Sequence, residues 1–339
     1  MAILQLDKPT ISSESGANMR VLVTGGAGFI GSNFVRMVLD DSANQFTFVT
    51  VLDALTYSGN LANIENYLEH PKFKFVQGDI RNSNTVQSLV EQNDAIINFA
   101  AESHVDRSIN SREEFISTNV VGTQVLLDAA IEFGIRRYLQ ISTDEVYGSI
   151  KTGSAKEDDR LDPNSPYSAS KAAGDLLVRS YVETFGLNAS ITRSSNNYGP
   201  FQHIEKLIPR FISNLVRDMP VPIYGDGSNI RDWIHVNDNC RGILKVFTSG
   251  ATGEIFNIGG NNELTNIEVT RILLRELGKS DDHIQFVTDR LGHDLRYSID
   301  TTKIRKTLGF QPEVEFSIGL RDVVKWYVKN SHWWENQSA

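Results

Sequence analysis

Two short stretches of the sequence carry side chains that could move protons. Residues 142–148, STDEVYG, place a hydroxyl, two adjacent carboxylates and a tyrosine after a strand-like run. Adjacent carboxylates repel each other, so in an enclosed site one can hold a proton while the other stays ionised. Tyr167 and Lys171, in PYSASK, are four apart on a predicted helix, where we expect the ammonium to favour the phenolate and lower the pKa of the tyrosine. The pattern indicates acid–base catalysis; a solvated acidic loop and a surface tyrosine–lysine pair are the alternatives.

A glycine-rich loop at residues 24–34, TGGAGFIGSNF, follows the first predicted strand and opens a helix. Gly25, Gly28 and Gly31 suit a tight turn, close approach of a pyrophosphate and close packing of the helix on the strand. Asp53 ends the second predicted strand, where it can accept hydrogen bonds from a ribose and would repel a 2′-phosphate. The pattern predicts NAD rather than NADP; a structural turn beside an exposed aspartate is the alternative.

The elements that must hold these residues alternate between short apolar runs and amphipathic stretches, which is typical of a Rossmann-like, doubly wound α/β fold with a parallel sheet. Strands are predicted at 20–24, 46–52, 73–77, 95–99, 137–142 and 189–193, and helices after Gly28 and at 85–91, 112–133 and 165–185. Ser165, Pro166 and Gly186 mark the ends of the last helix. GDI (78–80) and AAES (100–103) end two strands at the edge where such sheets bind ligands, although Asp79 alone also fits a solvated turn.

Composition and segment boundaries narrow the possible functions. We expect a flexible extension at residues 1–18, a cofactor-binding domain at 19–194 to which some later segments return, and a smaller C-terminal α/β domain at 195–335. A net charge of −9 argues against nucleic-acid binding. The single cysteine, Cys240, excludes an intramolecular disulfide, and no metal-ligand pattern, membrane-spanning apolar run or secretory signal is recognisable. These features predict a cytoplasmic protein with neither a metal nor a membrane partner.

With these motifs, the chain resembles the extended short-chain dehydrogenases/reductases, and more narrowly the dTDP-glucose 4,6-dehydratases. The resemblance runs from residue 20 to the C-terminal helices and rests on TGGAGFIG, AAESHVDRS, STDEVYG, PYSASK, SNNYGP, PIYGDG, RDW and DRLGHD. Sugar-nucleotide epimerases and decarboxylases share many of these motifs, whereas the triplet Thr143-Asp144-Glu145 distinguishes the dehydratases. The resemblance implies an NAD-dependent lyase that removes water from dTDP-glucose to give dTDP-4-keto-6-deoxyglucose.

The resemblance also implies the roles of five catalytic residues. Tyr167 would remove the proton of the glucose 4-hydroxyl while the hydride passes to NAD, and Lys171 would hold the tyrosine and the cofactor ribose. Glu145 would then remove the C5 proton and Asp144 would protonate the departing 6-hydroxyl, after which the hydride returns to C6. Thr143 would bond the 4-oxygen. Both acids can serve one substrate only if the strand ends by Thr143, because consecutive strand residues point to opposite faces.

The binding residues implied by the resemblance fall into two sets. Those expected at NAD are Gly25, Gly28, Phe29, Ile30, Gly31, Asp53, Ala54, Leu55, Thr56, Asp79, Ile80, Phe99, Ala100, Ala101, Ser103, Thr118, Tyr167, Lys171 and Asn197. Those expected at the dTDP-sugar, which the domain at 195–335 would bind, are Ser103, Thr143, Asn196, Lys206, Leu207, Pro222, Ile223, Tyr224, Arg231, Asn266, Asp289, Arg290, Gly292 and His293. Arg231 suits a diphosphate, although an ion pair with Asp226 or Asp232 is the alternative. His293 also fits a packing role.

One departure and two rival functions accompany the resemblance. Leu291 stands where the family usually has proline, so we expect a less rigid loop. A UDP-sugar epimerase or decarboxylase would need the Tyr167–Lys171 pair but not the two acids, and a non-catalytic NAD-binding regulator would be expected to lack a reactive residue. Related enzymes form homodimers through the helices corresponding to 112–133 and 165–185. The resemblance therefore implies a homodimer that serves deoxysugar and polysaccharide biosynthesis.

Overall fold

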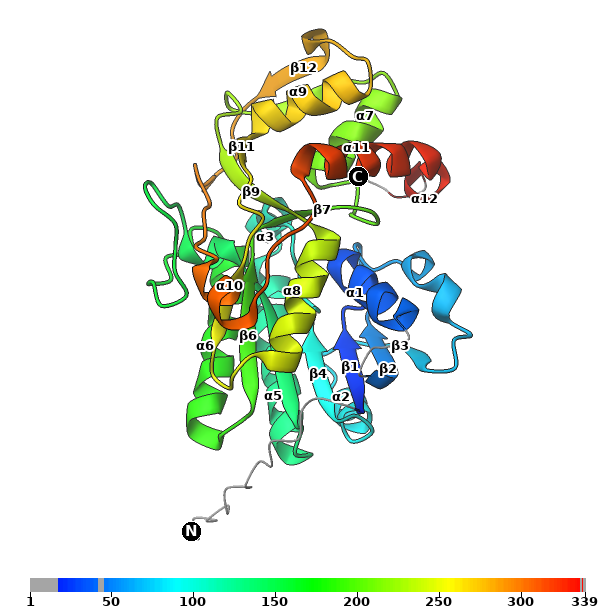
Figure 1. Ribbon diagram of the computed structural model, residues 1–339, viewed down its shortest axis with the longest axis vertical. Helices are drawn as coiled ribbons and strands as arrows, with labels where there is room; N and C mark the ends of the chain where they lie inside the picture. The colour runs from blue at the N-terminus through cyan, green and yellow to red at the C-terminus, as the bar shows by residue number, and fades with distance from the viewer. Residues whose placement is uncertain (1–17, 42–45, 336, 338–339) are drawn as a thin grey trace.

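A seven-stranded sheet forms the centre of the protein. The computed structural model describes residues 18–41, 46–335 and 337, so the predicted extension at 1–18 lies outside the described residues except for Asn18. The sheet contains β1 (Met19–Thr24), β2 (Phe46–Asp53), β3 (Phe73–Gln77), β4 (Ala95–Asn98), β5 (Arg137–Thr143), β6 (Ala189–Ser194) and β10 (Ile255–Ile258). Its order is β10-β6-β5-β4-β1-β2-β3, and all neighbours pair in parallel (Figure 1). The six predicted strands and the doubly wound fold are confirmed.

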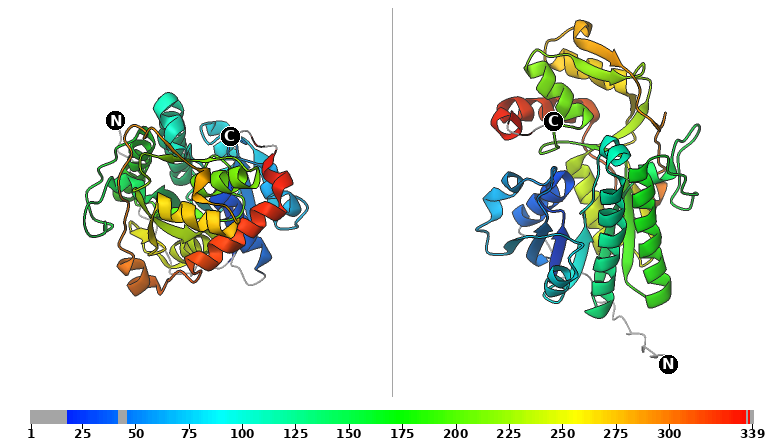
Figure 2. Two further views of the ribbon diagram at one scale, coloured as in Figure 1. Left: turned by 90° about the horizontal axis from the view of Figure 1, so that it is seen from above. Right: turned by 180° about the vertical axis from the view of Figure 1, so that it is seen from behind.

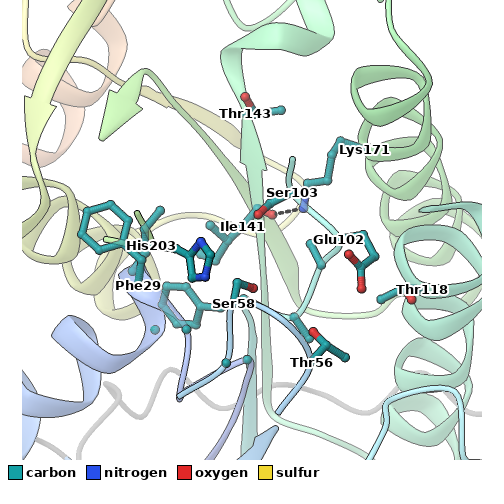
Figure 3. A pocket seen from close by; sticks show the side chains of 18 of the residues that line it. Phe29, Thr56, Ser58, Glu102, Ser103, Thr118, Ile141, Thr143, Lys171 and His203 are labelled. Atoms are coloured by element: carbon teal, nitrogen blue, oxygen red, sulfur yellow. Dashed lines mark hydrogen bonds between the residues drawn. The ribbon is translucent and has the colours of Figure 1, made fainter. Parts of the chain in front are cut away.

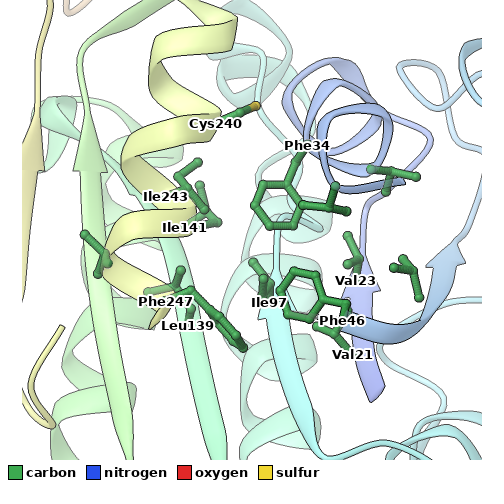
Figure 4. Packing of buried hydrophobic residues seen from close by; sticks show 14 of the residues in the cluster. Val21, Val23, Phe34, Phe46, Ile97, Leu139, Ile141, Cys240, Ile243 and Phe247 are labelled. Carbon is green, nitrogen blue, oxygen red and sulfur yellow. The ribbon is translucent and has the colours of Figure 1, made fainter. Parts of the chain in front are cut away.

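Helices cover both faces of this sheet, which explains why its strands read as nearly continuous apolar runs. One face carries α1 (Phe29–Asp40), α8 (Val236–Ser249) and α10 (Thr302–Leu308), and the other carries α2 (Ser83–Val90), α5 (Thr123–Glu132) and α6 (Pro166–Phe185). On the first face, Phe34 of α1 and Ile243 and Phe247 of α8 meet Phe46 and Leu139 of the sheet (Figure 4). The carboxyl ends of the strands are thereby held on a rigid, three-layered support.

The predicted helix at 112–133 is continuous in the structure but contains an irregular turn. It consists of α4 (Arg112–Ile116), a π-helical segment η3 (Ser117–Gly122) and α5, and it follows the short helix α3 (Val105–Asn110). The predicted ends of α6 are confirmed as well. The Ser165 hydroxyl accepts from the Ser168 N–H, Pro166 takes the first helical position, and Gly186 ends the helix with a φ of 70°.

A small lobe stands over the carboxyl edge of the sheet (Figures 1 and 2). Its elements are β7 (Asn196–Tyr198), α7 (Leu207–Val216), β8 (Val221–Tyr224), β9 (Ile230–His235), β11 (Glu263–Thr265), α9 (Asn266–Glu276), β12 (Ile284–Val287), α11 (Phe316–Lys329) and α12 (Ser331–Glu335). The strands form two short sheets, β11-β9-β7 and β12-β8. Its separate core includes Tyr198, Phe211, Trp233, Tyr327 and Trp334. The short helical turns elsewhere are η1 (Leu61–Asn63), η2 (Glu65–Tyr67), η4 (Asp144–Tyr147) and η5 (Asp281–His283).

The chain crosses between the two parts more than once. After β9 it returns to the large sheet as α8 and β10, and α10 packs there again before α11 closes the small lobe. The division of the sequence at residue 194 stays a prediction. Within the described ranges, no helix combines the length and the apolar character needed to cross a membrane.

Candidate active site

The acidic triplet sits where β5 ends and a tight helical turn begins. Thr143 is the last residue of β5 and caps η4: its Oγ1 accepts from the Glu145 N–H at 3.2 Å and donates to Asp144 Oδ1 at 3.3 Å. This turn replaces the alternation of a strand, so both Asp144 and Glu145 line one cavity. The condition that the strand ends by Thr143 is therefore met. Asp144 is buried, and Glu145 is half-buried at the cavity wall.

Helix α6 brings the tyrosine and the lysine to the same cavity. Tyr167 and Lys171 both line it, and the Tyr167 ring packs edge-on against Phe115, with ring centroids 6.2 Å apart. The Lys171 ammonium donates to the Ile141 carbonyl oxygen on β5 at 2.6 Å (Figure 3). The structure thus assembles five side chains around one space, which residues at the end of β2 and directly after β1 and β4 also enclose: Thr143, Asp144, Glu145, Tyr167 and Lys171. We call this space the first cavity.

The two acids differ in how strongly the protein disfavours their charged forms. Burial, and then the charge of Glu145, raise the pKa of Asp144 well above its usual value. Burial also raises the pKa of Glu145, but Arg290, Arg231 and Lys206 oppose that rise. The arrangement favours a protonated Asp144 beside an ionised Glu145, which is the division of labour that an acid and a base require.

The prediction that Lys171 lowers the pKa of Tyr167 is wrong for this structure. Burial raises the pKa of Tyr167 well above its usual value, the charges of Glu145 and Asp144 add to the rise, and a hydrogen bond with Thr143 opposes it. Lys171 is directed to a backbone carbonyl instead, and burial lowers the pKa of its own ammonium to about 8. The enclosure that the sequence could not reveal outweighs the helical spacing of the pair.

The glycine loop leaves a bare backbone at the floor of the first cavity. A Cβ on Gly25 would lie 2.6 Å from the Ala100 nitrogen, and one on Gly31 would lie 2.3 Å from the Gly25 carbonyl oxygen. The side-chain oxygens of Asn196 and Asn197 are buried at this cavity without a partner among the described residues. Glycines that admit no side chain and unpaired polar groups beside them fit a dinucleotide.

Asp53 is already anchored at the end of β2. Its carboxylate accepts from the backbone N–H groups of Ala27 at 2.9 Å and Leu55 at 2.8 Å. Burial raises the pKa of Asp53, and these backbone hydrogen bonds oppose the rise. The remaining lone pairs are held in a fixed direction at the first cavity, as recognition of a ribose requires.

Nearly all residues predicted for the cofactor line the first cavity. They are Gly25, Gly28, Phe29, Ile30, Gly31, Asp53, Ala54, Thr56, Asp79, Ile80, Phe99, Ala100, Ala101, Ser103, Thr118, Tyr167, Lys171 and Asn197. Leu55 lies outside this set, and its side chain packs against the core under α1. Asp79 forms an ion pair with Arg81, at 2.6 Å, at the rim.

A second cavity adjoins the first and lies against the small lobe. Five residues line both cavities, so the two spaces meet at Glu145 but not at Asp144: Ser103, Glu145, Asn196, Glu205 and Lys206. The predicted substrate residues at the second cavity are Ser103, Asn196, Lys206, Leu207, Pro222, Ile223, Tyr224, Arg231, Asn266, Arg290 and His293. Asp289 and Gly292 are not among the residues that line it.

The alternative roles considered for Arg231 and His293 come out differently. Arg231 forms no ion pair with Asp226 or Asp232 in the described part of the chain; its guanidinium donates to three backbone carbonyls and lies over the Tyr297 ring at 4.2 Å. His293 lies at the cavity, and its Nδ1 is 2.6 Å from Asp289 Oδ1. The positive charge of Arg231 at the second cavity is therefore not paired with Asp226 or Asp232, whereas the His293 ring is hydrogen-bonded to Asp289.

Comparison with known proteins places this arrangement in a family. The family model described as GDP-mannose 4,6 dehydratase matches residues 22–323. The chain belongs to that family. The resemblance drawn from the motifs is thereby confirmed in its broad form, and individual relatives sharpen it.

Three similar proteins show which members of this family resemble the chain over nearly its whole length. Agl12, a low-salt glycan biosynthesis protein of Haloferax volcanii, is 56% identical over 310 residues, which are 91% of this chain and 99% of the relative. A dTDP-glucose 4,6-dehydratase of an Actinoplanes species is 50% identical over 319 residues, 93% of this chain and all of the relative. The crystal structure of DesIV, a dTDP-glucose 4,6-dehydratase from Streptomyces venezuelae with NAD bound, has a TM-score of 0.93 at 52% identity and covers 94% of this chain and 100% of that one.

Several cavity residues of this dehydratase-family chain were not predicted from its motifs. Glu205 accepts from Arg107 Nε at 3.0 Å and lines both cavities; its position beside Lys206 was the available signal. Glu102 also lines the first cavity, although only its neighbours in the AAES motif were predicted to bind NAD. The Tyr297 hydroxyl oxygen lies 3.5 Å from Glu145 Oε2, although the two residues are 152 positions apart in the sequence. No local sequence pattern predicts that contact. Among the described residues, no group of histidine, cysteine and acidic side chains is placed to hold a metal ion.

Proposed function

We propose that this chain is an NAD-dependent dTDP-glucose 4,6-dehydratase, a hydro-lyase. The observation that carries the proposal is the meeting of Asp144 and Glu145 with Tyr167 and Lys171 in the first cavity, with Glu145 also lining the second. An epimerase or decarboxylase needs the second pair but has no use for a protonated acid beside a base. Dehydratases of this name are about half identical to the chain over almost its entire length.

The first half-reaction uses α6 and the end of β5. Tyr167 takes the proton of the glucose 4-hydroxyl, Thr143 bonds the 4-oxygen, and Lys171, which the Ile141 carbonyl orients, would hold the cofactor ribose. NAD, when bound there, would accept the hydride from C4 and return it to C6, and its positive ring would favour the phenolate of Tyr167. Thr143, Tyr167 and Lys171 are buried, which limits the access of water to the reactive ketone.

The second half-reaction uses the two acids. The ketone at C4 makes the C5 hydrogen acidic, Glu145 takes that proton, and Asp144 gives its proton to the departing 6-hydroxyl, so one water leaves. The opposing cations Arg290, Arg231 and Lys206 keep Glu145 the better base, while burial keeps Asp144 protonated. The pKa difference between adjacent carboxyls thus supports their separate roles.

The nucleotide part of the substrate fits the second cavity. Arg231 and Arg290 supply positive charge to a diphosphate in a chain whose net charge is −9. Tyr224, Asn266 and the neighbouring apolar wall offer a surface for the base. We assign dTDP rather than UDP because the similar dehydratases are named for dTDP-glucose. We also propose that the chain divides at residue 194 into a cofactor domain and a substrate domain.

The cellular setting is proposed on the same grounds. Exposed apolar side chains on the helices predicted to pair, Ile116, Val121 and Leu176, favour a homodimer. The proposal includes a cytoplasmic location and a role in deoxysugar and polysaccharide biosynthesis; of the relatives' names, that of Agl12 refers to glycan biosynthesis.

The decisive experiment is mass spectrometry of the product formed from dTDP-glucose in deuterated water, with UDP-glucose in parallel and Glu145→Gln as the control. We expect loss of one water and gain of one non-exchangeable deuterium at C5, both absent in the variant. A product of unchanged mass would replace this proposal with an epimerase. Loss of carbon dioxide only when a UDP-glucuronate is supplied would replace it with a decarboxylase.

A further inference from the structure

A chain of three side chains leads from the start of α6 to Glu145. Asp294 is buried, and its Oδ1 accepts from Asn164 Nδ2 at 2.7 Å while its Oδ2 accepts from the Tyr297 hydroxyl at 2.8 Å. The Tyr297 oxygen lies 3.5 Å from Glu145 Oε2. Asn164 directly precedes Ser165, the cap of the helix that carries Tyr167. Asp294 therefore ties the helix start to the acid pair.

The contacts of Asp294 also fix the backbone beneath the second cavity. Its carbonyl oxygen accepts from Arg231 Nη2 at 2.9 Å, and the Arg231 guanidinium lies over the Tyr297 ring. Tyr297 is thus clamped on its face by a cation and at its oxygen by a carboxylate. Neither contact leaves the ring free to rotate away from Glu145.

A phenol has one proton to donate, and its direction matters here. The 2.8 Å bond to Asp294 is of ordinary strength, whereas 3.5 Å to Glu145 is at the limit of hydrogen bonding. The proton therefore goes to Asp294, and the lone pairs of the Tyr297 oxygen face Glu145. A lone pair accepts a bond from a protonated carboxyl but repels an ionised one.

We propose that Asp294 is a positioning residue that, by accepting the Tyr297 proton, presents an acceptor to Glu145 and so favours the protonated product of C5 deprotonation. In that step the C5–H bond breaks, its electron pair stays on the sugar as the enolate, and the proton forms an O–H bond on Glu145 that points to the Tyr297 oxygen. This inference rests on the base role proposed above for Glu145.

Other charged or titratable groups face Glu145 and are unchanged by substitution at Asp294. They are Asp144 beside it, Tyr167 from α6, Lys206 before α7, Arg231 from β9, and Arg290 in the loop after β12. Asp294 touches none of the reacting groups, but its negative charge also raises the pKa of Glu145 through space. A change in Glu145 produced by Asp294→Asn therefore has one part from the lost charge and one part that passes through Tyr297.

Asp294→Asn is the informative substitution because it reverses the hydrogen bond. The asparagine oxygen can still accept from Asn164, but its amide must then donate to the Tyr297 oxygen, which turns the phenol proton toward Glu145. We expect the apparent pKa of Glu145, measured by infrared difference spectroscopy with Glu145→Gln for assignment, to fall by about one unit, and C5 deuterium exchange to slow about tenfold. Formation of reduced cofactor in the first half-reaction should be unchanged.

The double variant separates positioning from general destabilisation. Tyr297→Phe removes the intermediary, so adding Asp294→Asn to it should lower the pKa of Glu145 only by the part that the lost charge contributes, clearly less than Asp294→Asn does when Tyr297 is present. Asp238→Asn is the control for the loss of a buried carboxylate away from both cavities and should leave both readouts unchanged. Asp238 accepts two backbone N–H groups and pairs with Arg241 at 2.7 Å. Tyr297→Phe alone also keeps the test open if Asp294→Asn does not fold.

The outcomes distinguish this inference from the proposed function. Additive effects of the two substitutions, or an unchanged Glu145 titration in Asp294→Asn, would overturn the positioning role while leaving the dehydratase intact. Persistent C5 exchange in Glu145→Gln would instead remove the base role on which the inference depends.

Discussion

The two cavities of this protein are built in different ways. The first lies along the carboxyl ends of parallel strands, where main-chain geometry places glycines, Asp53 and the acidic turn. The second is walled by short elements and loops, and its central cation, Arg231, is held by carbonyl oxygens of Ile230, Asp294 and Leu295. The first cavity therefore follows from the geometry of the sheet, whereas the second depends on contacts between side chains that are far apart in the sequence. Substitutions should therefore damage them unequally.

The largest effect is expected at the support of the first cavity. Arg193 on β6 and Asp175 on α6 form an ion pair at 2.9 Å with exposures of 1% and 0%. Arg193→Met would strand a buried carboxylate and lower the free energy of unfolding by about 3–5 kcal/mol. In the small lobe, Arg271→Met breaks a pair whose members are 55% and 63% exposed and should cost less than about 1 kcal/mol. Urea denaturation measures both, and equal costs would contradict the comparison.

The next effect concerns the glycine loop. Gly25 and Gly134 both have positive φ, 69° and 64°, but only at Gly25 would a Cβ meet other atoms, at the Ala100 backbone. Gly25→Ala should weaken NAD binding at least about tenfold, because the loop must shift away from the pyrophosphate, while Gly134→Ala shares only the conformational strain. Isothermal titration with NAD checks this. Similar losses in both variants would mean that strain alone matters.

The same contrast explains which features the sequence predicts. Glycine spacing, an acid at the end of a strand and helix caps are local signals, and the structure confirms the strands, the caps of α6 and the cavity position of Asp53. These signals work because a parallel sheet converts positions in sequence into positions along one edge. The motif-based resemblance extended this to most of the second cavity.

What the sequence does not reveal depends on contacts between distant segments. The Asn164–Asp294–Tyr297–Glu145 chain joins residues more than 100 positions apart. The expected pKa of Tyr167 was wrong because helical spacing shows a nearby lysine but not the burial that outweighs it. Leu55 does not line the cavity, because its partly buried side chain packs against the core instead. Enclosure and long-range pairing are properties of the folded molecule.

A smaller effect should come from the acid that the first cavity holds protonated. Burial raises the pKa of Asp144 in the folded state, so its stabilising contribution is complete below the unfolded pKa and is lost as pH rises through the folded one. Asp144→Asn removes that loss, and we expect it to raise the free energy of unfolding at pH 7 by about 1 kcal/mol while abolishing dehydration. The gain should vanish below a pH of about 4, where aspartate is protonated in both states. Denaturation at several pH values tests this, and a gain that persists in acid would assign it to packing instead.

The smallest effect is expected in the loop of the second cavity. Leu291 is 77% exposed, so its side chain contributes little to packing, and Leu291→Pro acts mainly by restricting the unfolded chain. We expect stability to change by no more than about 0.5 kcal/mol and the KM for dTDP-glucose to change less than about threefold, with kcat preserved. Leu291→Ala is the control for loss of the side chain alone. A large fall in kcat with proline but not with alanine would show that the loop must move during turnover, which would make the second cavity as dependent on its backbone as the first.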